Sequence, residues 1–310
     1  MKKIIALISL ALCMVFVFTA CSSGGKSSGN SAGIKETLKN CNIEVLACNF
    51  DDEVTGLDEE FVGSSFQKVD GRSFVNLILK VENTSTAELN EENISAYFMH
   101  NDLRYDMQME IETKSLTSFG IETVAPGEVE IVHLIQRIDE EVKGSDITVK
   151  LTVDGKEFDV KVDAEDTRAP IEKKTKVSVG DTVDVDGKYS FEVVSCKEKA
   201  YLSTTDEAKS EQYQSVDRKF VDMVIKLTNN SGFELKEMRA YTIIDNETYA
   251  GETSREINEN TELEELMFES LKDGETEYCH AYAVVPENVD TAGAMVRFNL
   301  GGNCYYCTVE

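Results

Sequence analysis

The chain has 310 residues, with 58 Asp and Glu against 31 Lys and Arg, and its formal net charge is -27 at pH 7. This balance argues against a nucleic-acid partner, since nucleic-acid binding needs positive charge to displace counterions, and it disfavours adsorption to anionic lipid. Strong negative charge is typical of a solvated surface that keeps an exposed protein soluble, and we expect a monomer.

Residues 1–20 show the three parts of a secretory signal peptide: a basic start, a long apolar run and small residues at the end. The run from Ile4 to Phe18 is shorter than the roughly 20 residues that a membrane-spanning helix needs. The sequence Phe18-Thr-Ala-Cys21 resembles a bacterial lipobox, with Phe18 in place of the usual Leu. The resemblance implies that Cys21 becomes the first residue and carries acyl chains such as palmitate. The alternative is an ordinary secretory signal with an incidental Cys21.

Residues 21–33 are rich in Ser and Gly and predict a flexible tether behind the anchored cysteine. Two or more acyl chains hold a protein stably on a bilayer, whereas a single chain holds it only marginally. We therefore expect the protein to be lipid-anchored on the extracellular face of the cell membrane.

A repeat organises the remaining residues. The run at residues 218–229 places alternate apolar side chains on one face of an expected strand, and the run at residues 72–83 does the same. The expected inward residues are Val221, Met223, Ile225 and Leu227 in the later run and Val75, Leu77, Leu79 and Val81 in the earlier one. The residues expected on the opposite, wetter face are Asn76, Lys80, Asp222 and Lys226. Both runs end in Asn, Ser, Thr or Gly, which favour turns.

Matched segments occur in the same order in both copies and predict an internal duplication. Examples are residues 43–48 against 191–196, 127–133 against 274–280, and 149–155 against 296–302. The predicted boundaries are a first β-sandwich repeat at 34–163, a charged linker at 164–176 and a second β-sandwich repeat at 177–310. Copies of this size can each bury a core of their own.

Each copy offers short strands separated by turn signals, a pattern typical of an antiparallel β-sandwich. Hairpin turns are predicted at Asp154-Gly155 and Gly301-Gly302, because both positions tolerate positive φ, and an opening hairpin of copy two turns at Asp186-Gly187. The capping-box spacing of Thr261 and Glu264 predicts a short helix there. The predicted fold class is all-β, with two tandem immunoglobulin-like antiparallel β-sandwiches after the signal peptide.

Copy two resembles the telokin-like, immunoglobulin-fold family of unknown function found in Gram-positive secreted lipoproteins. The resemblance covers residues 177–309 and is carried by the segments at residues 179–183, 220–231 and 271–275. Copy one matches more weakly and lacks the Val-Gly-Asp-Thr opening, so the resemblance does not decide whether it begins with a hairpin. The resemblance implies a fold and no catalytic residues.

An even number of cysteines follows Cys21, which invites disulfides in an exported protein. They are Cys41, Cys48, Cys196, Cys279, Cys304 and Cys307. Cys41 and Cys48 would lie on opposite faces of an unbroken strand. Cys304-Tyr-Tyr-Cys307 has redox spacing, but it falls on a predicted strand rather than at a helix N-terminus. A Cys279–Cys307 or Cys196–Cys279 bridge is one hypothesis. Buried thiols that act as small hydrophobes are the other.

The three histidines are interpreted as structural rather than metal-binding. His133 and His280 occupy equivalent positions, and neither has a second zinc ligand at close spacing. Asp184-Val-Asp-Gly187 resembles part of a calcium loop, but the Glu and flanking helices of an EF-hand are missing. With no triad order, phosphate loop or His-Glu-x-x-His motif, we expect no enzyme, no cofactor and no metal.

The leading functional hypothesis is a non-catalytic, membrane-anchored lipoprotein that binds an extracellular protein or cell-wall glycan. Two insertions join equivalent strands, at residues 51–65 and 199–215, and loops on a rigid scaffold often carry binding. The alternative is that both insertions are variable spacers. The alternatives are a passive envelope protein without a specific ligand and a calcium-tuned module. Exposed Tyr or Phe on the insertions would favour binding, and acidic tips without aromatics would favour the passive hypothesis.

Overall fold

The computed structural model describes residues 33–57, 65–67, 69, 71–112, 119–120, 123–163, 174–208, 210 and 212–309. The predicted signal peptide and Cys21 lie outside these residues, as does the tether up to residue 32. Among the described residues, no helix has the length and hydropathy required to cross a membrane.

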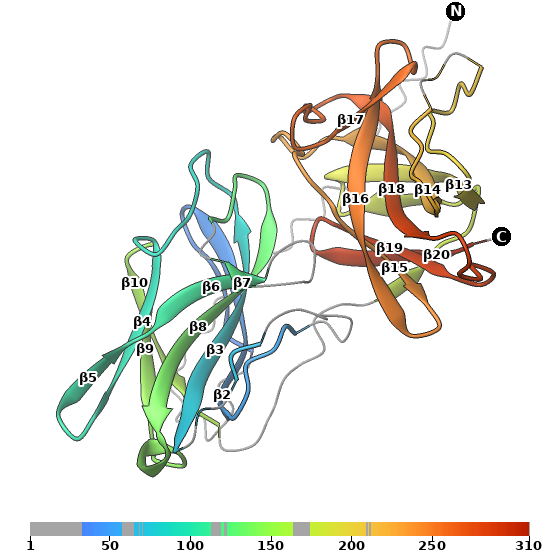
Figure 1. Ribbon diagram of the computed structural model, residues 1–310. Helices are drawn as coiled ribbons and strands as arrows, with labels where there is room; N and C mark the ends of the chain where they lie inside the picture. Colours follow the sequence, from blue (N-terminus) through green and yellow to red (C-terminus); the bar gives the residue numbers. More distant parts are fainter. Residues whose placement is uncertain are drawn as a thin grey trace, which may run out of the picture.

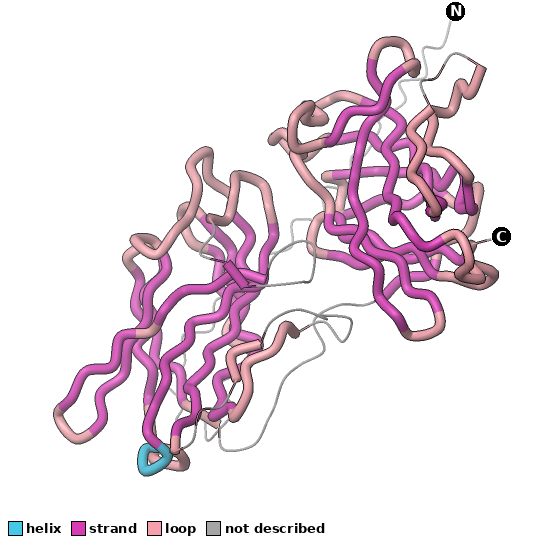
Figure 2. The backbone as a smooth tube through the Cα atoms, in the orientation of Figure 1, coloured by secondary structure: helices cyan, strands magenta, loops and turns pink. Residues whose placement is uncertain are grey.

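The chain is almost entirely β-structure and forms a β-sandwich architecture of several sheets (Figure 1). The strands of the first half, residues 33–163, are β1 Lys35–Thr37, β2 Cys41–Asp51, β3 Arg72–Asn83, β4 Ile94–His100, β5 Leu103–Asp106, β6 Gln108–Glu112, β7 Phe119–Gly120, β8 Val129–Asp139, β9 Thr148–Val153 and β10 Lys156–Lys161. A single 3-10 turn at Glu140–Val142 is the helical segment visible in Figure 2.

The strands of the second half, residues 174–309, are β11 Lys174–Lys176, β12 Thr182–Val185, β13 Tyr189–Lys199, β14 Arg218–Asn229, β15 Arg239–Ile244, β16 Glu247–Ile257, β17 Glu262–Glu265, β18 Thr276–Pro286, β19 Met295–Leu300 and β20 Asn303–Thr308. The predicted linker thus ends in a strand, because β11 pairs in parallel with β20. The helix predicted at Thr261 is wrong, since Glu262–Glu265 pairs with β16 as β17.

The two halves repeat one strand order. In the first half β2-β3-β8-β6 lie side by side, opposite the sheet β10-β9-β4-β5. In the second half β13-β14-β18-β16 correspond to the first of these sheets and β20-β19-β15 to the second. The strand β16 pairs with β15 at its start and with β18 further on, so it joins both sheets, whereas Met107 separates the equivalent β5 and β6.

Each half has a separate apolar core between its sheets, and the alternation predicted for the central strands is confirmed. Val75, Leu77, Leu79 and Val81 belong to the core of the first half, and Val221, Met223, Ile225 and Leu227 belong to that of the second. The turns at Asp154-Gly155, Asp186-Gly187 and Gly301-Gly302 are also confirmed, with positive φ at both positions of each. Copy one has a short opening hairpin as well, in which β1 pairs with β2.

A β-bulge interrupts β2 between Val45 and Ala47, and β13 has one at the equivalent place between Val193 and Ser195. The extra residue reverses which face the later side chains point to. Cys41 and Cys48 therefore both lie in the core of the first half, and the prediction of opposite faces is wrong. The bulge in β13 likewise brings Cys196 into the core of the second half.

Candidate functional site

The outer faces of the two central sheets carry buried polar groups. The prediction of a wetter face is therefore wrong for Asn76 and Asp222, whereas Lys226 is exposed as expected. Asn76 and Asp222 are fully buried, as are His133 and His280 on the neighbouring strands. In each half one described residue of the insertion, Leu57 or Leu202, packs on this face in a second, smaller apolar layer. These layers contain Leu46, Ala47, Ile78, Ile131 and Leu57 in the first half and Leu202, Phe220, Leu263, Tyr282 and Val284 in the second.

The cluster in the second half consists of His280, Asp222, Glu256 and Lys199. The His280 Nδ1 atom lies 3.1 Å from both carboxylate oxygens of Asp222, and Nε2 lies 3.0 Å from Glu256 Oε1. Lys199 Nζ lies 2.8 Å from Asp222 Oδ2. Four strands converge here, because these residues come from β18, β14, β16 and the end of β13. Two basic side chains thus face two carboxylates, and His280, Asp222 and Glu256 are almost fully buried while Lys199 lies at the edge of the cluster.

The charges set the protonation of this cluster. Burial lowers the pKa of His280, but the negative charge of Asp222 and hydrogen bonds to Asp222 and Glu256 outweigh burial and raise the pKa to about 9. Burial likewise raises the pKa of Asp222, yet the charges of His280 and Lys199 hold it below its ordinary value. At neutral pH His280 is therefore an imidazolium between carboxylates.

The same cluster holds the second insertion. The Thr205 backbone N–H donates to Glu256 Oε1 at 2.6 Å, and its hydroxyl donates to Glu256 Oε2 at 2.8 Å. The Thr204 hydroxyl donates to the Asn260 carbonyl at 2.6 Å. Next to these contacts, Leu202 and Tyr213 exchange backbone hydrogen bonds across the insertion. Glu256 therefore ties an irregular segment to the histidine of the sheet.

The first half contains the equivalent cluster. His133 Nδ1 lies 3.2 Å from Asn76 Oδ1, and Nε2 lies 2.9 Å from Glu112 Oε1. Glu112 Oε1 also accepts the backbone N–H of Leu57, at 2.6 Å, and so ties down the first insertion. The Asn76 amide donates to Asp51 Oδ2 at 2.8 Å. The same arrangement of histidine, carboxylate and insertion backbone thus occurs twice.

The sequence interpretation missed this arrangement, although a signal was available. The pairs His133 and His280, Asn76 and Asp222, and Glu112 and Glu256 occupy matching positions of the repeat. Polar residues kept in both copies on otherwise apolar strands indicate a shared buried contact. A buried charge that loses its partner is strongly destabilising, so the two clusters act as latches that hold the insertions in place.

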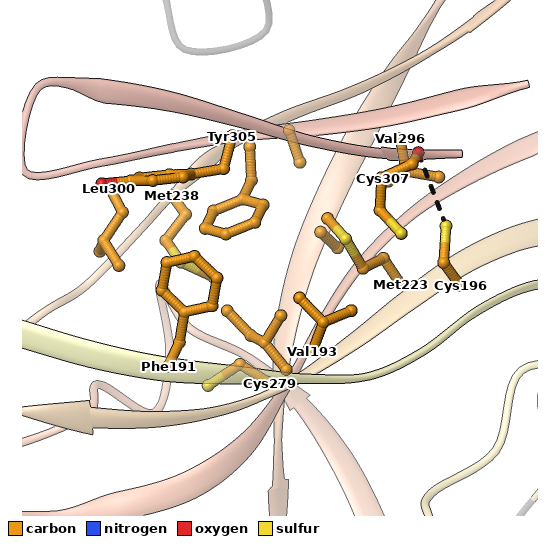
Figure 3. Close-up of a cluster of buried hydrophobic side chains, with 14 of the residues drawn as sticks. Phe191, Val193, Cys196, Met223, Met238, Cys279, Val296, Leu300, Tyr305 and Cys307 are labelled. Atoms are coloured by element: carbon orange, nitrogen blue, oxygen red, sulfur yellow. Dashed lines mark hydrogen bonds between the residues drawn. The ribbon is translucent and has the colours of Figure 1, made fainter. Parts of the chain in front are cut away.

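The cysteines are buried thiols throughout the described part of the chain. Cys196 and Cys279 lie on β13 and β18, the two neighbours of β14, so two strand spacings, about 9–10 Å, separate them. A disulfide needs Cα atoms roughly 4.4–6.8 Å apart, and the predicted Cys196–Cys279 bridge is therefore excluded. Figure 3 places Cys279 away from Cys307, which argues against their bridge, and burial raises the pKa of Cys279 to about 12.

In two further candidate binding sites, an acidic turn and a groove, the charged side chains bind other groups of the chain. Asp184, in the acidic segment considered for calcium, accepts the Gly187 backbone N–H at 2.9 Å and so closes a turn. A groove of about 820 Å³ lies between the two halves, but its lysines already have partners. Lys35 pairs with Glu44 at 2.8 Å, Lys188 pairs with Glu82, and Lys80 donates to the Gly302 carbonyl.

No protein-family model and no curated protein matches this chain. Among solved structures, an uncharacterized β-sandwich protein from Clostridium difficile 630 aligns with 42% of this chain and 90% of its own, at 23% identity and a TM-score of 0.38. The β-sandwich assignment rests on the sheets and cores of the chain itself.

Proposed function

We propose that this protein is a non-catalytic lipoprotein, anchored through Cys21 to the extracellular face of the cell membrane. Its two halves act as tandem immunoglobulin-like modules, of the telokin-like kind, that bind an extracellular protein or a cell-wall partner. The binding surface is the pair of insertions, and the second insertion contributes the principal contacts.

One observation carries this proposal: the second insertion is fixed to its sheet by a buried latch and still presents an aromatic side chain to solvent. Tyr213 is 40% exposed, while its backbone pairs with the buried Leu202. Its hydroxyl donates to the Leu263 carbonyl at 3.4 Å, which orients the ring. Val216, close by in the chain, is 87% exposed. An exposed aromatic on the insertion is the feature expected of a binding surface rather than of a passive protein.

The physical advantage of a latched insertion is preorganisation. A loop that is already held in one conformation avoids much of the ordering cost that weakens association. Tyr offers a large contact area with little conformational freedom to lose, which suits it to the centre of an interface. The buried charges thus contribute to recognition through the loop that they hold, without contacting the partner.

The experiment is a capture from extracellular and cell-wall fractions with the full mature chain in detergent. The proposal expects a partner that is captured by the wild type and lost in Tyr213→Ala combined with Val216→Ser. The control is Met99→Ser with Leu103→Ser, which removes exposed apolar groups from a hairpin of the first half.

Equal capture by the wild type and by the Tyr213 variant would show that the partner binds elsewhere than at the second insertion. No capture with or without calcium would favour the passive envelope protein. A melting temperature that rises on adding calcium would instead support the calcium-tuned module, because a ligand selective for the folded state stabilises it.

A further inference from the structure

We propose that Cys196 and Cys307 form a disulfide that joins the two sheets of the second half. The inference rests on the export that the proposed function includes, because structural disulfides persist in oxidising compartments. This pairing differs from both bridges that the sequence suggested.

The structure brings these two cysteines together from opposite sheets. Cys196 lies on β13, in the sheet of β14 and β18, whereas Cys307 lies on β20, beside β19. The Cys196 Sγ donates to the Cys307 carbonyl at 3.7 Å, and both side chains are buried in the core. Figure 3 shows the two side chains pointing into the same part of the core from facing strands.

Local backbone features direct the side chains of Cys196 and Cys307 into the same part of the core. The bulge before Ser195 turns Cys196 inward, as described above. On β20 the alternation places Tyr305, Cys307 and Val309 inward. The Cys196 Sγ reaches the backbone of Cys307 itself, at 3.7 Å from its carbonyl oxygen, so the two strands come close at this point of the core.

The neighbouring Cys304 is held away from this reaction. It points to the other face of β20, where the Arg297 guanidinium donates to its Sγ from Nε at 3.2 Å and from Nη2 at 3.0 Å. Cys279 lies at the other end of the same core, next to Phe191 and Val193 in Figure 3. Cys307 is therefore the partner that the geometry offers to Cys196.

The oxidant is a disulfide, either of a thiol oxidoreductase or of a small molecule such as oxidised glutathione. One cysteine thiolate attacks this disulfide, the S–S bond of the oxidant breaks and a mixed disulfide forms. The second cysteine then attacks the mixed disulfide. The Cys196–Cys307 bond forms, the pair has lost two electrons and two protons, and the oxidant leaves as two thiols. Because both groups are buried in the folded chain, the exchange takes place during folding after export.

The test is peptide mapping of the mature chain, isolated from membranes in the presence of an alkylating reagent. Trypsin releases Cys196 in residues 189–197, Cys279 in residues 273–297, and Cys304 with Cys307 in residues 298–310. The proposal predicts a linked species of residues 189–197 and 298–310 that separates on reduction. The linked species persists in Cys304→Ser and is lost in Cys307→Ser.

Three results would overturn the proposal: alkylated Cys196 in the exported chain, a link between Cys196 and residues 273–297, or a link that disappears in Cys304→Ser. Export is measured separately, by cleavage of the chain on intact cells with a protease that does not cross the membrane. An exported chain with alkylated Cys196 contradicts the disulfide and leaves the proposed function standing. Thermal unfolding with and without reductant gives a second measurement. Reduction is expected to lower the melting temperature of the wild type. It should leave unchanged that of the variant Cys196→Ala with Cys307→Val.

Discussion

His280 links the stability of the second half to pH. Its pKa is about 9 in the folded chain and about 6.5 in an unfolded chain, so the folded state binds the proton more tightly. The resulting stabilisation is fully present below pH 6.5 and is lost as the pH rises through 9. Asp222 has the opposite sign, because its lowered pKa stabilises the fold above the ordinary Asp value and that contribution is lost in acid.

The first prediction concerns this titration. Between pH 6.5 and 9 the free energy of unfolding of the wild type falls by on the order of 3 kcal/mol, the equivalent of the His280 shift. His280→Gln removes the titrating group and flattens the slope, and urea unfolding over this pH range measures it. His100→Gln, in the β4–β5 hairpin, is the control and keeps the slope. A wild-type free energy that does not change between pH 6.5 and 9 would show that His280 is not held protonated.

At the scale of the element, Glu256 decides whether the second insertion stays on the sheet. In Glu256→Ala the acceptor of the Thr205 backbone and hydroxyl is lost, so the segment around residues 199–215 opens. We predict faster proteolytic cleavage within this segment, which mass spectrometry of the released peptides measures. The matched control is Glu252→Ala on the same strand, whose carboxylate accepts from the Tyr282 hydroxyl and does not contact the insertion. Equal cleavage rates in the two variants would contradict the latch.

The crossing of β16 between sheets depends on Gly251. A Cβ at this position would lie 2.7 Å from the backbone carbonyl of Ala240, and backbone cannot move aside as a flexible side chain can. We predict that Gly251→Ala costs about 1–3 kcal/mol of stability, in the range of overpacked sites. The exposed neighbour Ala250→Ser leaves stability unchanged in the same denaturation measurement. A Gly251→Ala variant as stable as the wild type would mean that the two strands do not approach this closely.

The elements differ in how far the sequence could predict them. Period-two alternation located the inward faces of β3 and β14, and paired turn residues located the hairpins at Asp154-Gly155 and Gly301-Gly302. Bulges leave no such signal, because one added residue looks like ordinary strand, and the faces of Cys48 and Cys196 depended on them. Local capping signals predicted a helix at Thr261, but pairing of β17 with β16 overrides them.

The polar residues of the two clusters could be found as matching positions of the repeat, but their burial could not be predicted. Alternation distinguishes two faces of a strand, but it does not show what covers the polar one. Asn76 and Asp222 therefore looked solvent-facing, whereas both are fully buried in clusters whose carboxylates, Glu112 and Glu256, bind the segment that precedes each strand. Only the three-dimensional path of the insertion converts an apparent surface residue into a buried one.

Across the whole molecule, Arg239 connects the second half to the latch of the first. Its Nη2 donates to the Glu112 carbonyl at 3.1 Å and lies 3.5 Å from Glu130 Oε2. Glu112 is also the carboxylate that holds His133, so the contact between halves and the first insertion share one residue. The guanidinium is almost completely buried, so it attracts the carboxylate more strongly than in water but also costs more to desolvate.

We predict that Arg239→Gln loosens the two halves relative to each other. Small-angle scattering should then show a broader distribution of interatomic distances than in the wild type, because the buried ion pair between the halves is lost. Arg218→Gln, which removes an exposed arginine at the start of β14, is the control and leaves the distribution unchanged. Identical distributions for wild type and Arg239→Gln would show that this contact does not fix the halves.

A latched binding surface requires that a buried histidine–carboxylate cluster fixes each insertion to its sheet. Hydrogen exchange of the Leu57 and Thr205 amides tests it directly, since each amide donates to the carboxylate of its cluster. We predict that both amides exchange far more slowly than amides of an open loop, because each is held in a hydrogen bond to a buried carboxylate. Exchange of both at the rate of unprotected amides would mean that the insertions are not held, and the latched binding surface would be refuted.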